Sequence, residues 1–334
     1  MARKLIAVIL LLAVFVVGVP LAAGLLLGAG AGGDEADGGD DEDFAGKLKT
    51  PQTITVWLTD EERAQELDFE EYVACVTASE MPADFDEEAL KAQSVAARTY
   101  AMAKLSKYAD AKPASHPEAA LCDTTHCQVY KDEAELIAIH EAGWEESGLA
   151  KIKKACAATA GELLYYQGEL VSQPLFFSSS GGQTENSEDV FSGAYPYLVS
   201  VSSPYEEQAT HQNEEKSFSL TELAARLAAA YPEKSVGALS AENIKILDHT
   251  QGGRVSEIKI GSAVFAGTQV RSALGLSSAM FTISFSADGT MITFTSNGSG
   301  HGVGMSQYGA HGMALAGSDY RQILTHYYSG TEVH

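Results

Sequence analysis

Residues 69–102 read FEEYVACVTASEMPADFDEEALKAQSVAARTYAM, a pattern that predicts two consecutive helices. Three apolar residues recur at helical spacing in the first helix: Phe69, Val73 and Val76. The next position on that stripe, four residues on, is Glu80. Pro82 cannot continue a helix and disfavours helical geometry at the residue before it, so we expect helices at about 68–81 and 86–108. One carboxylate therefore stands where an apolar side chain is expected.

Glu80 lies at the end of the first predicted helix, among carbonyl groups that lack an intrahelical partner. Burial and the negative end of the helix dipole both disfavour the charged carboxylate, so both raise the pKa of Glu80. A carboxylic acid that is still protonated near neutral pH can act as a general acid. The pattern alone fits equally well a Glu that reaches solvent. Arg98, in a helix built mostly of apolar residues, is either a functional companion of Glu80 or half of an ordinary structural ion pair.

The N-terminal region predicts a membrane anchor followed by a linker. Residues 5–27 are almost wholly aliphatic and long enough to cross a hydrocarbon core of about 30 Å. A cleaved signal peptide is the alternative, because residues 29–31 are small, but its apolar run is usually only about 7–15 residues long. Two bases within residues 1–4 predict a cytoplasmic stub, a single pass through the cell membrane and an extracytoplasmic remainder. Residues 28–46 hold seven acids, no base and many glycines, which predicts a flexible linker.

Residues 47–334 predict an α+β domain, either one body or two lobes. Short alternating or apolar runs predict strands at 54–58, 163–166, 174–178, 254–260 and 280–294. Further helices are predicted at 132–160 (interrupted near 143 and at 147–148), 218–231, 306–316 and 319–328. The formal net charge of -23 argues against nucleic acid as a partner, because phosphate contacts need concentrated Lys and Arg.

Two imidazoles and two thiols lie within twelve residues: His116, Cys122, His126 and Cys127. This set could give zinc a closed tetrahedral site, although its spacing matches no standard zinc finger. Ligands at adjacent positions cannot both chelate from a regular helix, so the loop would have to fold around the ion. A disulfide between Cys122 and Cys127 is an equally good interpretation outside the cytoplasm. Two other cysteines stand on apolar helix faces, where a buried thiol is usual: Cys75 and Cys156.

Two glycine-rich loops could surround a polar ligand. Residues 178–184, SSSGGQT, follow a predicted strand and offer hydroxyls and amides to a sugar, although a plain polar turn would look the same. Residues 300–310, GHGVGMSQYGA, let backbone amides crowd around a ligand at a helix start. His301, Gln307 and Tyr308 supply hydrogen-bonding groups there, although a single His is often structural.

Taken together, these segments resemble the stage II sporulation protein D family, which also includes amidase-enhancer relatives. The resemblance is carried, in order along the chain, by residues 78–82, 89–100, 179–184, 195–198, 253–255, 300–310 and 326–331. It covers nearly the whole predicted extracytoplasmic part. Several motifs in the same order make an accidental similarity a poor explanation.

The resemblance implies a membrane-anchored lytic transglycosylase that cleaves peptidoglycan glycan strands during engulfment in sporulation. It also implies an amidase/endopeptidase and a multispanning membrane protein as partners. The family's catalytic Glu corresponds to Glu80 and its Arg to Arg98. We expect these residues to position the strand: Gln93, Arg98, Tyr100, Ser180, Gly181, Gly182, Thr184, His301, Gln307 and Tyr308. The resemblance also favours zinc over the disulfide, as a structural ion, because clostridial-type members hold a metal through a comparable His/Cys loop.

A single carboxylate is enough for this chemistry if the C6 hydroxyl of the sugar is the nucleophile. Glu80 would protonate the glycosidic oxygen between MurNAc and GlcNAc and then accept the proton of that hydroxyl, which gives a 1,6-anhydro product. Three nearby acids could supply a second carboxylate but fit better as helix-start acids: Asp84, Asp86 and Glu88. The alternative function is a noncatalytic wall-binding activator of an N-acetylmuramoyl-L-alanine amidase.

Overall fold

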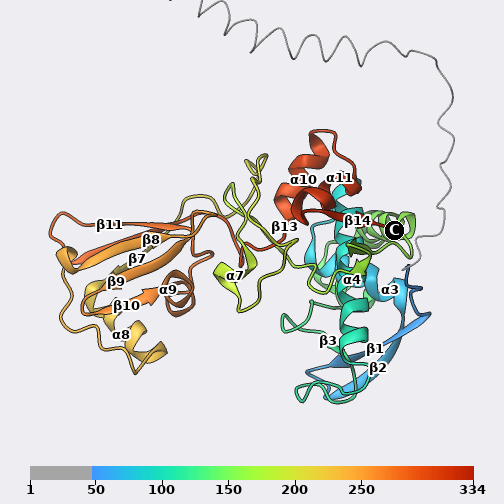
Figure 1. Ribbon diagram of the computed structural model, residues 1–334, viewed down its shortest axis with the longest axis horizontal. Coiled ribbons are helices and arrows are strands. Elements are labelled where there is room, and N and C mark those ends of the chain that lie inside the picture. Colours follow the sequence, from blue (N-terminus) through green and yellow to red (C-terminus); the bar gives the residue numbers. More distant parts are fainter. Residues whose placement is uncertain (1–46) are drawn as a thin grey trace, which may run out of the picture. The chain divides into compact units, whose positions relative to one another are not determined.

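A computed structural model describes residues 47–334 of the chain (Figure 1). The predicted stub at 1–4, anchor at 5–27 and linker at 28–46 lie outside the described residues. Within the described part, no helix combines the length and the apolar character needed to cross a membrane. Helices and short strands of both pairing directions alternate without a regular βαβ order, so the predicted α+β class is confirmed.

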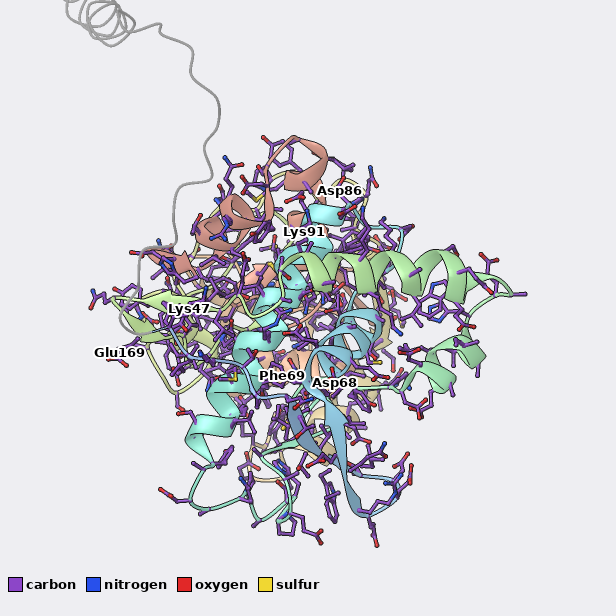
Figure 2. The ribbon with its side chains drawn as sticks, turned by 90° about the vertical axis from the view of Figure 1, so that its right-hand side faces the viewer. Lys47, Asp68, Phe69, Asp86, Lys91 and Glu169 are labelled. Atoms are coloured by element: carbon purple, nitrogen blue, oxygen red, sulfur yellow. The ribbon has the colours of Figure 1, made fainter. Side chains whose placement is uncertain are left out.

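The two predicted helices are α3, Phe69–Glu80, and α4, Glu87–Lys107. Each begins at an aspartate whose side chain accepts a backbone N–H of the first turn, Asp68 for α3 and Asp86 for α4. Figure 2 shows both aspartates at the starts of their helices. The chain leaves α3 at Met81 in an extended conformation, as expected before a proline. The break that the sequence predicted at this point is therefore present.

Helix α4 is the packing centre of this part of the chain. Nearly every residue from Ala89 to Ala103 is buried. Helix α4 packs against α3, against α6 (Ala150–Ala158), and against α10 (Gln307–Leu315) and α11 (Tyr320–Tyr327) from the C-terminal end. The small side chains of α4 let four helices approach one axis, which explains its high alanine content.

Short sheets complete the packing around these helices. Strand β1, Thr53–Leu58, pairs antiparallel with β2, Arg63–Asp68, and parallel with β3, Leu121–Cys122. Strands β4 (Leu164–Tyr166), β5 (Glu169–Leu170) and β14 (Thr331–Val333) form a second sheet in the order β14-β4-β5. A parallel pair joins β6, Phe176–Phe177, to β13, Met305–Ser306. Three short helical segments lie between these strands: α5 (Glu133–Ile139), a π turn (Glu145–Leu149) and α7 (Ser187–Val190).

Residues 214–296 build two further sheets with their own hydrophobic core. The sheets are β10-β9-β8 (Ala263–Ala266, Val255–Ile260, Ile244–His249) and β11-β12-β7 (Phe281–Phe285, Met291–Ser296, Glu214–Ser219). Helices α8, Leu220–Ala230, and α9, Gly267–Leu274, contribute to the same core. All of its buried members lie between Phe218 and Phe294. We call residues 214–296 the insert module; Figure 1 shows it in yellow and orange.

Several predicted boundaries within the insert module were wrong. Helix α8 was predicted to begin at Phe218 but begins at Leu220 with Ser219 as its cap, and Phe218 belongs to strand β7. The run predicted as one strand at 280–294 is a hairpin, β11 and β12, that turns at Gly289. Strand β7, EEKSFS, was not predicted, because its charged residues do not form the usual strand pattern. Its pairing with β12 stabilises it as a strand.

Candidate active site and metal centre

Glu80 is the last residue of α3. Its Oε1 accepts the backbone N–H of Val129 at 2.8 Å, and its Oε2 has no hydrogen-bond partner among residues 47–334. Burial raises the pKa of Glu80, and the Val129 hydrogen bond offsets part of that rise. One oxygen is thus held in place while the other is free to exchange a proton. The position at the helix end and the raised pKa agree with the sequence prediction.

The acids that follow Glu80 are largely occupied by the start of α4. Asp86 caps the helix. Glu88 accepts the Nζ of Lys91 at 2.7 Å and the backbone N–H of Tyr320 at 2.9 Å. Asp84 is exposed. Asp86 and Glu88 are therefore helix-start acids, as expected. Glu80 differs from them, because one of its oxygens is held by Val129 and the other has no partner among residues 47–334.

Arg98 lies in the protein interior, which corrects the prediction that it contacts substrate. Its side chain is 0% exposed, and its Nε and Nη2 donate to the two carboxylate oxygens of Glu70 at 2.9 and 2.7 Å. Nη1 and Nη2 also donate to the carbonyl oxygens of Glu162 and Cys156. A fork of donors directed at one carboxylate is the usual arrangement of a structural Arg pair. The alternative of a structural ion pair therefore describes Arg98.

Two other predicted contacts on α4 are buried as well. Tyr100 is 6% exposed and lies close enough to Cys122 and Cys127 for their charges to raise its pKa, after burial itself. Gln93 is fully buried, and its Oε1 accepts the side-chain amide of Gln307 from α10 at 3.4 Å. The Nε2 of Gln93 has no partner within the described residues. The structure thus brings Gln93 and Gln307 together and places Tyr100 beside the His/Cys loop.

The first glycine-rich loop, 178–184, is organised by a carboxylate that the sequence prediction missed. Glu206 is 7% exposed and accepts the backbone N–H groups of Ser180 and Gly181. It also accepts three hydroxyls, from Ser180, Ser203 and Ser306. The loop closes further through Gly182 N–H to the Ser180 hydroxyl and through three hydrogen bonds between Thr184 and Val201. These polar groups are therefore directed at Glu206 and Val201. The buried side chains of Ser180 and Thr184 are thus structural, which corrects their predicted sugar contacts. Gly181 is half-buried and Gly182 is exposed, so these two stay predicted contacts.

His301 in the second glycine-rich loop also has both ring nitrogens engaged. Its Nδ1 accepts the N–H of Val303 at 3.1 Å, so Nε2 carries the proton and donates to the carbonyl oxygen of Phe176 at 3.0 Å. Burial lowers the pKa of His301 to about 4. The prediction that His301 binds substrate is corrected: it holds the loop against β6. Tyr308 differs, because its hydroxyl has no partner among residues 47–334 and its ring meets Phe85 edge-on at 5.0 Å.

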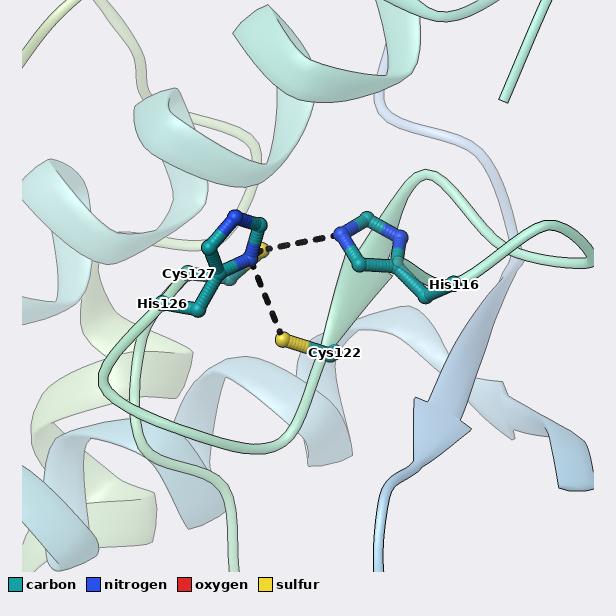
Figure 3. Close-up of side chains that lie close together, drawn as sticks. All are labelled: His116, Cys122, His126 and Cys127. Carbon is teal, nitrogen blue, oxygen red and sulfur yellow. Dashed lines mark hydrogen bonds between the residues drawn. The ribbon is translucent and has the colours of Figure 1, made fainter. Parts of the chain in front are cut away.

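The four predicted metal ligands come together (Figure 3). One donor atom from each of His116, Cys122, His126 and Cys127 lies within 4.8 Å of all the others. The loop between Asp123 and Cys127 turns back on itself, as adjacent ligands require. All four cysteines of the chain are free thiols, so Cys122 and Cys127 do not form the alternative disulfide. Cys75 and Cys156 are buried thiols, as predicted.

The geometry of this cluster fits zinc. Zinc bound at about 2.3 Å to sulfur and about 2.0–2.1 Å to nitrogen in a tetrahedron holds S and N ligands about 3.6 Å apart. The nitrogen and sulfur atoms lie 3.6 Å apart for both contacts of His126 and 3.7 Å apart for His116 and Cys127. His116 donates Nδ1–H to the carbonyl oxygen of Ala119, which leaves the lone pair of Nε2 facing the cluster. The hydrogen bond between the two thiols lowers the pKa of Cys122 and raises that of Cys127, so Cys122 is the one that favours the thiolate a metal requires.

Comparison with known proteins identifies the family of this chain. Residues 59–166, which contain Glu80 and the four cluster residues, match the family model described as Stage II sporulation protein. Stage II sporulation protein D of Bacillus subtilis (strain 168) is 39% identical over 289 residues, which cover 85% of this chain and 79% of that protein. The chain belongs to the stage II sporulation protein D family. The protein of the same name from Bacillus amyloliquefaciens is 36% identical over 288 residues, with the same shares covered. The amidase enhancer of B. subtilis is 30% identical over 302 residues, 77% of this chain and 39% of that protein.

This family member also has a buried ion pair that sequence reasoning missed. Glu185 and Arg254 are 0% and 3% exposed in their side chains and lie 3.4 Å apart. Gly302 lies against them, since a Cβ there would stand 2.2 Å from the Arg254 guanidinium carbon. The pair joins the loop after β6 to the start of β9 and to the 300–310 loop of the stage II sporulation protein D chain. The sequence around a single acid in a polar loop does not show that the acid is buried in an ion pair. The dense glycines around position 302 were the one sequence feature that indicated close packing at this place.

Proposed function

We propose that this chain is a lytic transglycosylase that cleaves peptidoglycan glycan strands in sporulation. The observation that carries the proposal is the carboxyl of Glu80, with a raised pKa, one oxygen held by Val129 and the other free. Membership of the stage II sporulation protein D family supports the role in sporulation. The substrate bond is the one between MurNAc and GlcNAc, and the product carries a 1,6-anhydro ring.

The reaction needs one group that first gives and then takes a proton. Protonated Glu80 would donate its proton to the glycosidic oxygen as the bond to the anomeric carbon breaks. The resulting carboxylate would then accept the proton of the C6 hydroxyl as that oxygen closes on the anomeric carbon. Both transfers use the same oxygen, and no water enters the product. A raised pKa makes the first transfer possible near neutral pH, and Val129 fixes the orientation for both.

Zinc belongs to this proposal as a structural ion. His116, Cys122, His126 and Cys127 would hold it, and the bound ion would supply a cross-link within their loop. The loop runs on to Val129, whose N–H holds Glu80. A fixed loop would thus keep the acid in position without entering the reaction.

The proposed setting is the outer face of the cell membrane. The apolar run at 5–27 would act as a single-pass anchor with residues 1–4 in the cytoplasm. The acidic residues 28–46 would give the domain reach toward the glycan. An amidase/endopeptidase and a membrane protein of an engulfment complex are the proposed partners. The net charge of -23 opposes binding to nucleic acid.

Digestion of peptide-free glycan strands tests the activity. The full-length chain in detergent is expected to release 1,6-anhydro ends, and Glu80→Gln is expected to release none while keeping its fold. Glu233→Gln, which changes an exposed acid in the insert module, is the matched control and should cleave like the unchanged chain. Equal release by Glu80→Gln and the unchanged chain would refute the role given to Glu80.

The second candidate function is a noncatalytic activator of an N-acetylmuramoyl-L-alanine amidase. The 30% identity to a protein named amidase enhancer favours it. An activator creates no new sugar ends on its own but increases the release of stem peptides when an amidase is added. Digests with and without an amidase, each with the Glu80→Gln chain alongside, therefore separate the two functions.

A further inference from the structure

A small pocket lies between the outer face of α10 and the loop that carries Tyr205. Its volume is about 250 Å³, and its walls include Tyr205, Glu207, Gln208, Tyr308, His311 and Leu315. Pockets that enclose a drug-sized ligand usually measure about 300–1,000 Å³. This one therefore suits a single ring with its substituents. No Lys or Arg lines it, so carboxylate groups have no countercharge there.

Tyr205 is held in a strained backbone conformation to face this pocket. Its φ is +70°, the largest among the four residues other than glycine with positive φ in 47–334, and it is the one aromatic residue of the four. Such a conformation costs a bulky side chain on the order of 1–3 kcal/mol. Gly312 allows the close approach, because a Cβ there would lie 2.1 Å from the Tyr205 carbonyl oxygen. The adjacent Glu206, with its five hydrogen bonds, anchors the loop.

The result is an exposed ring where burial would be expected. Tyr205 is 50% exposed and Leu315 is 57% exposed, and both line the pocket. An aromatic face surrounded by polar groups is how proteins present a stacking surface to a ring with apolar C–H faces and a hydroxyl rim. Strain kept at an exposed aromatic residue indicates a function for that residue.

The polar groups of the pocket are unoccupied by the protein itself. Among residues 47–334, neither the hydroxyls of Tyr205 and Tyr308 nor the side chains of Glu207 and Gln208 have a hydrogen-bond partner. His311 accepts the N–H of Asp86 at Nδ1, at 2.9 Å, so Nε2 carries the proton and is free to donate. The hydroxyls of Ser180 and Thr184 in the 178–184 loop, in contrast, are turned inward. The pocket therefore offers several free donors and acceptors to a ligand.

The pocket is connected to Glu80 through the short segment between α3 and α4. Phe85, five residues after Glu80, stacks on His311 with ring centroids 4.4 Å apart and meets Tyr308 edge-on. Asp86, the next residue, donates its N–H to His311. Two lining residues, Tyr308 and His311, thus pack against the segment that follows the proposed acid.

We propose that this pocket is a saccharide subsite that binds one neutral pyranose of the glycan strand, stacked on Tyr205. The inference rests on the proposed function for the identity of the polymer. Hydroxyls and an acetamido group match the free donors and acceptors, and the lack of lining cations disfavours a stem peptide with its carboxylates. The subsite would hold the strand a short distance along from the bond that Glu80 cleaves.

Binding to intact strands tests the subsite separately from cleavage. The full-length Glu80→Gln chain in detergent is titrated with soluble, peptide-free glycan strands, and Kd is compared with that of chains carrying a second change. Tyr205→Gly removes the ring and also relieves the positive φ, so its Tm should match or exceed that of the parent. We expect its Kd to rise about tenfold. Tyr205→Phe keeps the ring and should bind within about threefold of the parent.

A matched control guards against a general effect of losing exposed apolar surface. Leu247→Ala removes a side chain of similar exposure, 46%, from β8 in the insert module and should leave Kd unchanged. The subsite is overturned if the Tyr205→Gly chain binds strands as tightly as its Glu80→Gln parent. It is also overturned if Tyr205→Gly and Leu247→Ala raise Kd equally, or if the parent does not bind strands. The subsite is likewise overturned if Tyr205→Gly weakens the binding of free stem peptide but not the binding of glycan strands. If the unchanged chain releases no anhydro ends yet binding depends on Tyr205, the proposed reaction fails and the subsite stands.

Discussion

The backbone N–H of Val129 donates to Oε1 of Glu80 at 2.8 Å, across 49 residues of sequence. Val129 follows Cys127 by two residues, so the loop of the His/Cys cluster continues directly into the group that orients the acid. The side chain of Ser79 accepts the N–H of Lys131 in the same way. The end of α3 and the cluster loop are therefore connected by hydrogen bonds, so a change in the loop should alter the position of Glu80, and a change at Glu80 should alter the loop.

Replacing Glu80 with Gln should stabilise the protein at neutral pH. Because burial raises the folded pKa, the carboxyl contributes fully to stability below its unfolded pKa and loses that contribution as pH rises through the folded value. Gln keeps the acceptor for Val129 but carries no charge to bury. We expect a gain in stability at pH 7 that disappears below about pH 4, where the carboxyl is protonated in both states. Thermal melts across this range check it, and a Glu80→Gln chain no more stable at pH 7 would contradict the buried acid.

Loss of one cluster ligand should release the metal and weaken the active site. Cys122→Ser is expected to lose bound zinc, lower Tm by several degrees and reduce the release of anhydro ends, because the loop before Val129 loosens. Cys75→Ser changes a buried thiol outside the cluster and should keep one metal per chain. Elemental analysis with free-thiol counting gives the answer. If the unchanged chain held no metal and only two of its four cysteines were free thiols, the disulfide between Cys122 and Cys127 would be restored.

Shortening Arg98 should destabilise the fold rather than weaken substrate binding alone. Arg98→Ala removes a fully buried side chain and leaves Glu70 and two backbone carbonyls without their donors, which should cost about 2–4 kcal/mol of unfolding free energy. Arg226→Ala breaks an exposed pair with Glu222, 46% exposed on both sides, and should cost about 0–1 kcal/mol. Urea unfolding measures both. Normal stability of Arg98→Ala, together with a raised KM, would return Arg98 to the substrate site.

Gly302 should be intolerant of any side chain because of the residue that it faces. Gly302→Ala combines a φ of +87° with a Cβ 2.2 Å from the guanidinium carbon of Arg254, so we expect a loss of about 3 kcal/mol. Gly317→Ala has a similar φ, +97°, but no atom within 4 Å, and should lose about 1 kcal/mol. The difference between the two measures the clash with the buried ion pair. Equal losses would show that backbone conformation alone matters at Gly302.

Local patterns were enough to predict Glu80 and the cluster, because helix spacing, Pro82 and short-range ligand spacing act within a few residues. The partners of the buried charges depend on distant packing, which no local pattern contains. Arg98 finds Glu70 across 28 residues, and Glu206 takes a hydroxyl from Ser306 across 100. The glycine-rich loops were correctly recognised as unusual, but their polar groups serve the fold. The pocket beside Tyr205 gave no sequence signal, since its walls come from separate segments.

The insert module begins and ends at nearly the same point in space. Asn213 donates its N–H to the side-chain oxygen of Asn297 at 2.7 Å, and the paired strands β7 and β12 place Glu214 opposite Ser296. A segment joined to the rest of the chain in this way can be lengthened, exchanged or removed by a single genetic event without rerouting the backbone on either side. Evolution could thus have altered this part of the molecule independently of the acid on α3.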